Sequence, residues 1–293
     1  MVIRSLWILV WFLFSSSCAI LDDCSVEKVY LSPDNYDLLD SMPPYPVIYV
    51  LNHSAYKNEN LEELASRAYM MDRHGDETVT VSSSNAYSHD KLRVPLSQYL
   101  RSFEAEDDTR RTPHANESFY LFGDNYGGVW EQTANAYKVA NCAQCDRAGA
   151  KSVGIAGRHS GVSFHVHGAG FAEVVHGAKL WLLFPPQVSI EDVSYFGPNV
   201  SMVDWVERYV GALSRSEQRS LSLGTHTSAA VDVDVGEGHI AEYWDWHTLG
   251  LMQTCVLRPS ELIYFPTQWL HGTLNLEPYN HFISTFIDLQ LLR

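Results

Sequence analysis

The chain has 293 residues, of which 46% are hydrophobic and 19% charged, and its formal net charge is −15 at pH 7. This hydrophobic content is typical of a folded protein and argues against extensive disorder. The negative charge leaves no basic footprint, so we expect no nucleic acid among the partners. The length suits one large domain or two small ones.

Residues 1–19 have the pattern of a secretory signal peptide. Arg4 supplies a positive charge, an unbroken apolar run follows at 6–14, and small residues lead to Ala19. The run is shorter than the roughly 20 residues that a membrane-spanning helix needs. An uncleaved anchor is the alternative. No other apolar stretch approaches spanning length, so we expect no membrane span after cleavage.

In a protein that enters the secretory pathway, several short motifs predict glycosylation sites and disulfides. Three N-x-S sequons become expected glycosylation sites on exposed loops; they lie at Asn52, Asn116 and Asn199. Four cysteines remain after cleavage, namely Cys24, Cys142, Cys145 and Cys255. Disulfides are expected in an oxidising lumen, but the sequence does not choose among the three pairings. A redox or zinc role for the Cys142–Cys145 pair is the less favoured alternative, because neither a thioredoxin-like context nor a second cysteine pair is visible.

Residues 20–117 show a mixed α/β pattern. The segment from Ser32 to Val50 is rich in proline and then extended. Asn60 is a candidate cap for a helix, with Glu63 at the capping-box position. The apolar residues at 61–69 follow helical spacing, and Gly75 is expected to end the helix. A strand is expected at 78–81 and a short helix at 96–103. The polar segment 104–117 is expected to form a surface loop.

From residue 118 onward the pattern is mostly β. Short β-rich runs occur at 119–122, 151–156, 162–167, 171–175, 179–184, 253–258, 261–265, 269–276 and 281–289. Glycine and proline separate many of them, which favours an all-β barrel or sandwich. One helix is expected, with Ser201 as its cap and an apolar face of Met202, Trp205, Val206, Tyr209, Val210 and Leu213. The surrounding segment, at about 190–250, is interpreted as an insert between strands.

Two of these runs carry histidines on one strand face. Because side chains alternate along a strand, Ser163, His165 and His167 share a face opposite Val162, Phe164 and Val166. In the same way His271, Thr273 and Asn275 lie opposite Leu270, Leu274 and Leu276. A jelly roll brings such distant strands together, and three protein ligands leave positions open for substrate and oxygen.

The sequence therefore predicts a metal site at His165, His167 and His271. The alternative for any single histidine is a core residue with satisfied hydrogen bonds. The remaining histidines are interpreted as surface or loop residues. The aromatic residues near the site are interpreted as barrel core; they are Phe164, Phe171, Trp181, Tyr264 and Trp269.

The same stretches resemble the JmjC/cupin superfamily. The matching segments are SSNAYSHDKL at 82–91, YLFGDN at 120–125, FHVHGAGFAEVVHGAKLWLLFPP at 164–186, ELIYFPTQWLHGTLNL at 261–276 and FISTF at 282–286. The resemblance implies a mainly β fold, a double-stranded β-helix or jelly roll over 118–293, with an N-terminal α/β extension at 20–117 in the same unit. With the signal peptide it implies the endoplasmic reticulum lumen. The C-terminus carries no KDEL-type signal, so secretion stays an alternative.

The resemblance also implies Fe(II) and, in active members, 2-oxoglutarate as co-substrate. The family's metal ligands carry over to His165 and His271. Lys179 holds the position of a lysine that pairs with the distal carboxylate of 2-oxoglutarate, and a solvated surface lysine is the alternative. Asn275, a candidate cofactor-binding residue, ends a cupin motif that begins at Pro266.

One residue departs from the family pattern. Active members carry an acid where this chain has His167, so bound Fe(II) would be one charge unit more positive. Three-histidine sites occur in other cupins, so metal binding is retained more readily than 2-oxoglutarate chemistry. Glu173 is a candidate replacement acid, with a rim carboxylate as the alternative. Three functions stay open: a 2-oxoglutarate-dependent hydroxylase of a lumenal protein, an inactive scaffold that binds protein partners, and a three-histidine dioxygenase that needs no 2-oxoglutarate.

Overall fold

A computed structural model describes residues 24–32, 34–35, 42–51, 60–83, 91–106, 119–123, 129–139, 149–188, 201–206 and 252–287. The expected signal peptide, the three sequons, Cys142, Cys145 and most of the segment 190–250 lie outside these residues. In the part that is described, no helix is both long and apolar enough to cross a membrane.

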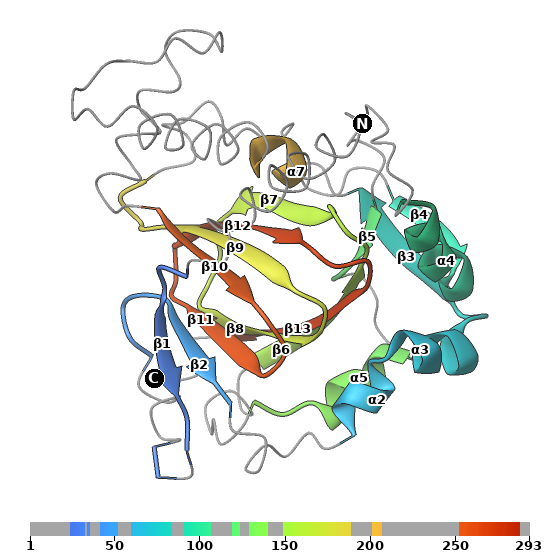
Figure 1. Cartoon of the computed structure of the whole chain (residues 1–293), viewed down its shortest axis with the longest axis horizontal. Helices are drawn as coiled ribbons and strands as arrows, with labels where there is room; N and C mark the ends of the chain where they lie inside the picture. Colours follow the sequence, from blue (N-terminus) through green and yellow to red (C-terminus); the bar gives the residue numbers. More distant parts are fainter. Residues whose placement is uncertain are drawn as a thin grey trace, which may run out of the picture.

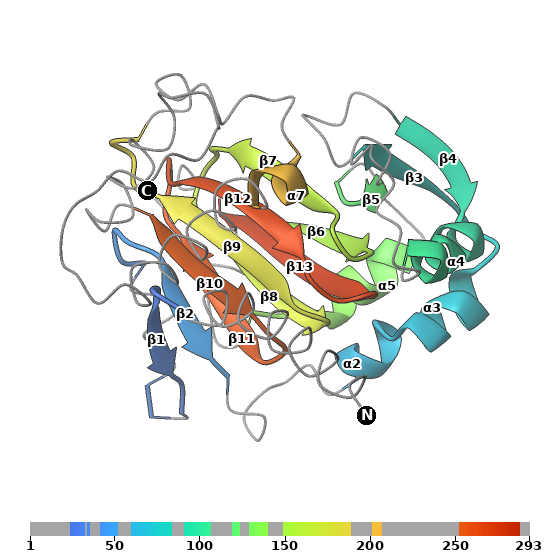
Figure 2. The same ribbon diagram turned by 45° about the horizontal axis from the view of Figure 1, so that its top comes forward.

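Two β-sheets face each other and enclose an apolar interior (Figures 1 and 2). The larger sheet has the order β1 (Glu27–Tyr30), β2 (Val47–Val50), β11 (Glu261–Phe265), β8 (Gly170–His176), β13 (Asn280–Ile287), β6 (Gly149–Ala156), β5 (Phe119–Leu121), β3 (Thr78–Ser83) and β4 (Lys91–Pro95). The smaller sheet has the order β10 (Gln253–Leu257), β9 (Lys179–Phe184), β12 (Leu270–Asn275) and β7 (Gly161–His165). The expectation of a mainly β jelly roll is confirmed.

The sheets are built from strands that lie far apart in the sequence. β13, near the end of the chain, pairs with β8 on one side and β6 on the other, antiparallel to both. β12 likewise lies between β9 and β7. The strands nearest the C-terminus therefore occupy central positions in both sheets.

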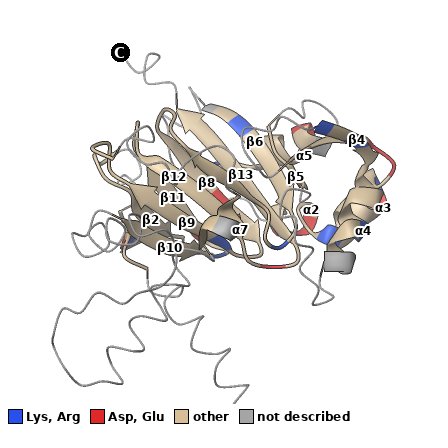
Figure 3. Ribbon diagram, turned by 90° about the horizontal axis from the view of Figure 1, so that it is seen from above, with Lys and Arg blue, Asp and Glu red and all other residues tan. Residues whose placement is uncertain are grey.

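A cluster of large apolar side chains from both sheets lines the space between them. Its members include Ile48, Trp181, Leu183, Ile263, Phe265 and Phe282. Burying each such side chain stabilises the fold by roughly 1.5–3 kcal/mol. Charged residues are sparse along the barrel strands (Figure 3), as a buried interior requires. We call this space the barrel interior.

Each sheet is also covered on its outer face. A second apolar cluster joins the large sheet to the helices α2 (Leu61–Leu64), α3 (Arg67–His74), α4 (Leu96–Glu106) and α5 (Val129–Ala136). A third joins the small sheet to α7 (Met202–Trp205), where Met202, Trp205 and Val206 are buried. The apolar face predicted for this helix is confirmed over its described residues.

The helical stretch predicted between Asn60 and Gly75 is confirmed at both ends, but it consists of two short helices and not one. The Asn60 side chain makes no capping hydrogen bond. Ser66 instead has an extended backbone, with φ −66° and ψ 146°, and its hydroxyl accepts a hydrogen bond from the Tyr69 amide. A serine in this conformation starts a new helix rather than continuing the old one.

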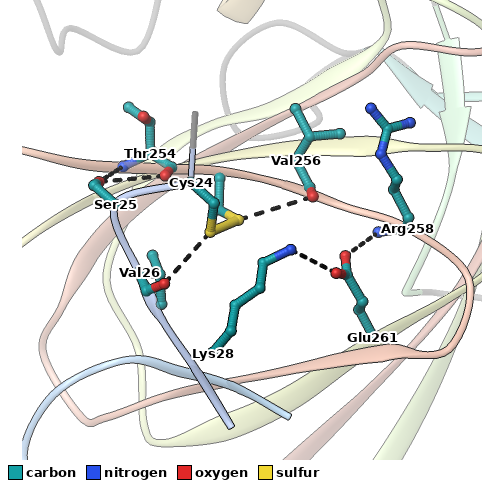
Figure 4. Close-up of a disulfide and its surroundings, with 9 residues drawn as sticks. Cys24, Ser25, Val26, Lys28, Thr254, Val256, Arg258 and Glu261 are labelled. Atoms are coloured by element: carbon teal, nitrogen blue, oxygen red, sulfur yellow. Dashed lines mark hydrogen bonds and ion pairs between the residues drawn. A yellow bond between two sulfur atoms is a disulfide. The ribbon is translucent and has the colours of Figure 1, made fainter. Parts of the chain in front are cut away.

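A disulfide between Cys24 and Cys255 fastens the N-terminal segment to the small sheet (Figure 4). Beside it the Ser25 amide donates to the Thr254 carbonyl at 2.9 Å. A few residues later the Lys28 ammonium pairs with the Glu261 carboxylate of the large sheet at 2.6 Å. The expectation of a disulfide is confirmed. Residues 24–30 thus join the edges of the two sheets and close the barrel along this seam.

Candidate metal centre

The three histidines predicted from the sequence converge on one point of the barrel interior. His165 ends β7, His167 lies two residues further on, and His271 is on β12 directly opposite His165. One ring nitrogen from each lies within 4.8 Å of the other two. Nitrogen ligands lie about 2.0–2.1 Å from a zinc-type ion, so a bound metal would draw the rings slightly closer together. The three residues form a metal-binding constellation.

The ring orientations leave one nitrogen of each histidine available to a metal. Nδ1 of His165 is 2.8 Å from the Ser163 carbonyl oxygen, and Nδ1 of His271 is 2.8 Å from that of Trp269. Nδ1 of His167 is 2.7 Å from the carbonyl oxygen of its neighbour Gly168. A carbonyl only accepts hydrogen bonds, so each Nδ1 carries the proton and each Nε2 keeps its lone pair. Such contacts also fix the rings of metal-binding histidines.

Burial keeps these imidazoles in the form that binds metals. Desolvation, together with the neighbouring charges of His167 and Lys179, lowers the pKa of His165 to about 4. Desolvation also lowers the pKa of His167. The pKa of His271 falls well below its ordinary value, first through desolvation and then through the charges of His165 and His167. All three are neutral at pH 7, as metal coordination requires.

A β-bulge in β7 sets the direction of His165, and it corrects one part of the predicted pattern. β12 residues His271 and Thr273 are two apart, whereas their β7 partners His165 and Val162 are three apart. The extra β7 residue interrupts the alternation, so Val162 packs toward the barrel interior although it was predicted to face away from His165. Phe164 faces α7 as expected.

Aromatic rings surround the histidines. Trp181 stacks on His271 with ring centroids 5.7 Å apart, and Phe265 lies 4.9 Å from the same ring. Phe286 approaches His167 at 5.1 Å. The interpretation of Trp181 as barrel core is incomplete, because this ring also touches a candidate ligand. Phe265 and Phe286 were not singled out, and their position in β11 and β13 carries no local signal of the site.

Lys179 begins β9 and is buried, with 3% of its surface exposed. Its ammonium lies 3.3 Å from the centroid of the Phe282 ring. Burial lowers the pKa of Lys179 to about 7. Its charge also depresses the pKa values of His165 and His271, so the ammonium lies within electrostatic range of both. The surface-lysine alternative is therefore wrong.

Asn275 lies directly across the strands from Lys179. Its Nδ2 donates to the carbonyl oxygen of Ser160 at 2.9 Å and to the Ser160 hydroxyl at 3.2 Å. Its Oδ1 is buried and has no hydrogen-bond partner within the described part of the chain. The open amide oxygen can only accept a hydrogen bond, so the buried Lys179 ammonium is the group that suits this end of the barrel interior to an anionic ligand.

Two other titratable residues lie away from the histidines. Glu173 on β8 is buried, but its neighbours Phe171 and Val175 pack into the cluster under the N-terminal helices. Alternation gives Glu173 the same outward direction, so it is neither a metal ligand nor a rim carboxylate. His281 on β13 is fully buried rather than at the surface, and desolvation lowers its pKa to about 3.

Three neutral imidazole nitrogens suit several first-row divalent metals, and Fe(II) is among them. The donor set therefore fits a metal ion. The fit of a carboxylate-bearing ligand rests on the buried Lys179 ammonium. The histidine cluster and the buried lysine both lie inside the same jelly roll.

Comparison with known proteins gives the family. A model described as "Cupin-like domain" matches residues 47–288. The chain is 32% identical over 230 residues to JmjC domain-containing protein 8 of Homo sapiens, covering 78% of this chain and 72% of the relative. It is 31% identical over 230 residues to the protein of the same name in Mus musculus, with 78% and 71% covered. The barrel and its histidine cluster both lie inside the matched range, and the chain belongs to the cupin-like family of JmjC domains.

Proposed function

We propose that the chain is an Fe(II)- and 2-oxoglutarate-dependent hydroxylase of protein side chains in the endoplasmic reticulum lumen. The observation that carries this proposal is the buried Lys179 ammonium, which lies in the same barrel interior as the three histidines. A lysine is rarely buried to this extent without a negatively charged partner. Among the ion pairs of the described residues, none involves Lys179.

The residues divide into three roles. His165, His167 and His271 would hold the iron through Nε2. Lys179 would pair with the distal carboxylate of 2-oxoglutarate, an interaction that is strengthened where water is excluded. The aromatic wall formed by Trp181 and Phe265 keeps water from the site. When bound, Fe(II) and 2-oxoglutarate would supply oxidation chemistry with dioxygen as the oxidant: one oxygen atom would go to the keto acid, which becomes succinate and carbon dioxide, and the other would enter a substrate C–H bond.

The proposed location rests on the signal-peptide pattern and on the Cys24–Cys255 disulfide, which is expected of an oxidising compartment. Glycosylation at the three sequons belongs to the same proposal. The substrate class is a protein side chain presented in the lumen, and secretion is the alternative destination.

His167 favours a second candidate, a metal-loaded scaffold without catalysis. A histidine replaces the acid that would neutralise part of the iron's charge, and this change weakens the case for 2-oxoglutarate chemistry. A three-histidine dioxygenase that does not use 2-oxoglutarate is the third candidate. It would consume oxygen without producing succinate.

One experiment separates these candidates. The protein, produced through a secretory pathway, is loaded with Fe(II) without oxygen and titrated with 2-oxoglutarate, and the visible charge-transfer band of the chelate is recorded. Lys179→Ala is run beside it. The proposal expects a band that needs a much higher 2-oxoglutarate concentration in the variant. Bound iron with no band would overturn it in favour of a scaffold or a dioxygenase that is independent of 2-oxoglutarate.

A further inference from the structure

Two buried polar atoms lie on neighbouring strands between the metal centre and Lys179, and neither has a hydrogen-bond partner among the described residues. Thr273 on β12 and Trp181 on β9 are directly opposite each other in the small sheet. The Thr273 hydroxyl and the Trp181 indole nitrogen are both buried, and no described residue forms a hydrogen bond with either of them. Because buried polar groups nearly always find a partner, an unpartnered pair at one place indicates a group that binds there.

Both side chains point into the barrel interior. Gly272, between His271 and Thr273, faces the opposite way, since a Cβ there would lie 2.8 Å from the Met202 sulfur under α7. Thr273 therefore points to the same side as His271. Trp181 belongs to the interior cluster and stacks on the His271 ring.

The polar side chains of β12 form a row along the barrel interior. From His271 the row continues through Thr273 to Asn275, with about 7 Å between successive members. Lys179 lies opposite the last of them and Trp181 opposite the middle one. The row thus runs from a metal centre, past a hydroxyl and an indole N–H, to an ammonium.

We propose that Thr273 and Trp181 are ligand-binding residues that donate hydrogen bonds to oxygen atoms of 2-oxoglutarate. This inference rests on the proposed function, and it adds two residues that the histidine cluster and Lys179 do not include. A hydroxyl and an indole N–H are both donors, and the carboxylate and keto oxygens of the ligand are acceptors. Binding would satisfy two groups that the protein alone leaves open.

The full mature chain is loaded with Mn(II), which replaces iron without oxidation chemistry, and 2-oxoglutarate is titrated calorimetrically. Thr273→Val keeps the shape of the side chain and removes the hydroxyl, so the affinity for 2-oxoglutarate should fall about tenfold. Trp181→Phe removes the N–H and keeps an aromatic ring, and it should also lower the affinity for 2-oxoglutarate. Neither change should reduce Mn(II) affinity.

Thr285→Val is the matched control. Thr285 is also a fully buried residue, and its hydroxyl forms no hydrogen bond with any residue that the structure describes. Its β8 partner Phe171, however, packs under the N-terminal helices, outside the barrel interior. This variant should bind 2-oxoglutarate as the wild type does. In both threonine variants the melting temperature should not fall, because the lost hydroxyl has no hydrogen bond to lose.

Three results would overturn the inference. Wild-type affinity in Thr273→Val would exclude a role for the hydroxyl. Equal weakening in Thr273→Val and Thr285→Val would indicate a general effect on the fold. A wild-type protein that binds Mn(II) but no 2-oxoglutarate would remove the proposed function together with this inference, and that result differs from a selective loss in the variants.

Discussion

Cys255 and Trp181 lie directly opposite each other across β10 and β9. One is bonded to Cys24 near the start of the described chain, and the other stacks on the candidate ligand His271. The covalent link that closes the barrel seam is therefore one strand away from the metal centre. Unfolding experiments test how much the disulfide stabilises this seam, and metal-binding experiments test the histidine site.

Removing the disulfide should destabilise the protein substantially. The two cysteines are 231 residues apart, and the chain-entropy estimate for a loop of this size is about 5 kcal/mol. Cys24→Ser should therefore lower the urea midpoint of unfolding, and a reductant should do the same to the wild type. A reductant that lowers the midpoint of Cys24→Ser by as much as that of the wild type would show that this disulfide is not the stabilising one.

Replacing His271 should abolish metal binding. His271→Gln keeps a polar side chain of similar size but removes the imidazole Nε2 from the three-histidine set. Its control is His281→Leu, which removes another buried histidine, one whose strand partner Ile155 packs under the N-terminal helices and outside the barrel interior. Metal content after anaerobic loading with Fe(II) and dialysis should fall only in His271→Gln. Normal iron in that variant would contradict the assignment of the ligand.

Burial of His281 should make stability depend on pH. Its pKa is about 3 in the folded protein against an ordinary 6.5, so the unfolded chain binds the proton first as pH falls. The stabilising contribution is complete above pH 6.5 and is lost by about 1.4 kcal/mol per pH unit between there and pH 3. Urea unfolding at pH 7 and at about pH 5 should show a smaller pH effect in His281→Leu than in the wild type. Equal pH effects in the two proteins would refute this reading.

Lys179→Met should stabilise the ligand-free protein and lower its affinity for 2-oxoglutarate. The substitution removes a buried ammonium that has an aromatic ring beside it but no ion pair with any described residue, a gain of about 1–2 kcal/mol. The pKa of about 7 means that the gain should be largest at and below pH 7, where the amine must carry its charge. Thermal unfolding of the ligand-free proteins at pH 6 and at pH 9 measures this. A lower melting temperature in Lys179→Met would indicate that the lysine is structural.

The strands of the barrel and the three ligands were predictable because they are marked by local patterns. β8, β9, β11 and β12 have buried apolar faces, and glycine or proline separates them. β1 and β4 were missed because both are edge strands with mostly exposed residues, which carry no alternating pattern. The burial of Lys179, the bulge before His165 and the partner of Cys24 depend on contacts between distant segments. No local pattern determines them.

The central place of β13 has a consequence for how the protein is made. Until residues 280–287 have left the ribosome, the facing edges of β6 and β8 have no strand between them. Open strand edges of this kind promote aggregation, so the nascent chain has to be protected until these residues have emerged. A stop codon before residue 280 would therefore yield an insoluble product, not a smaller working domain.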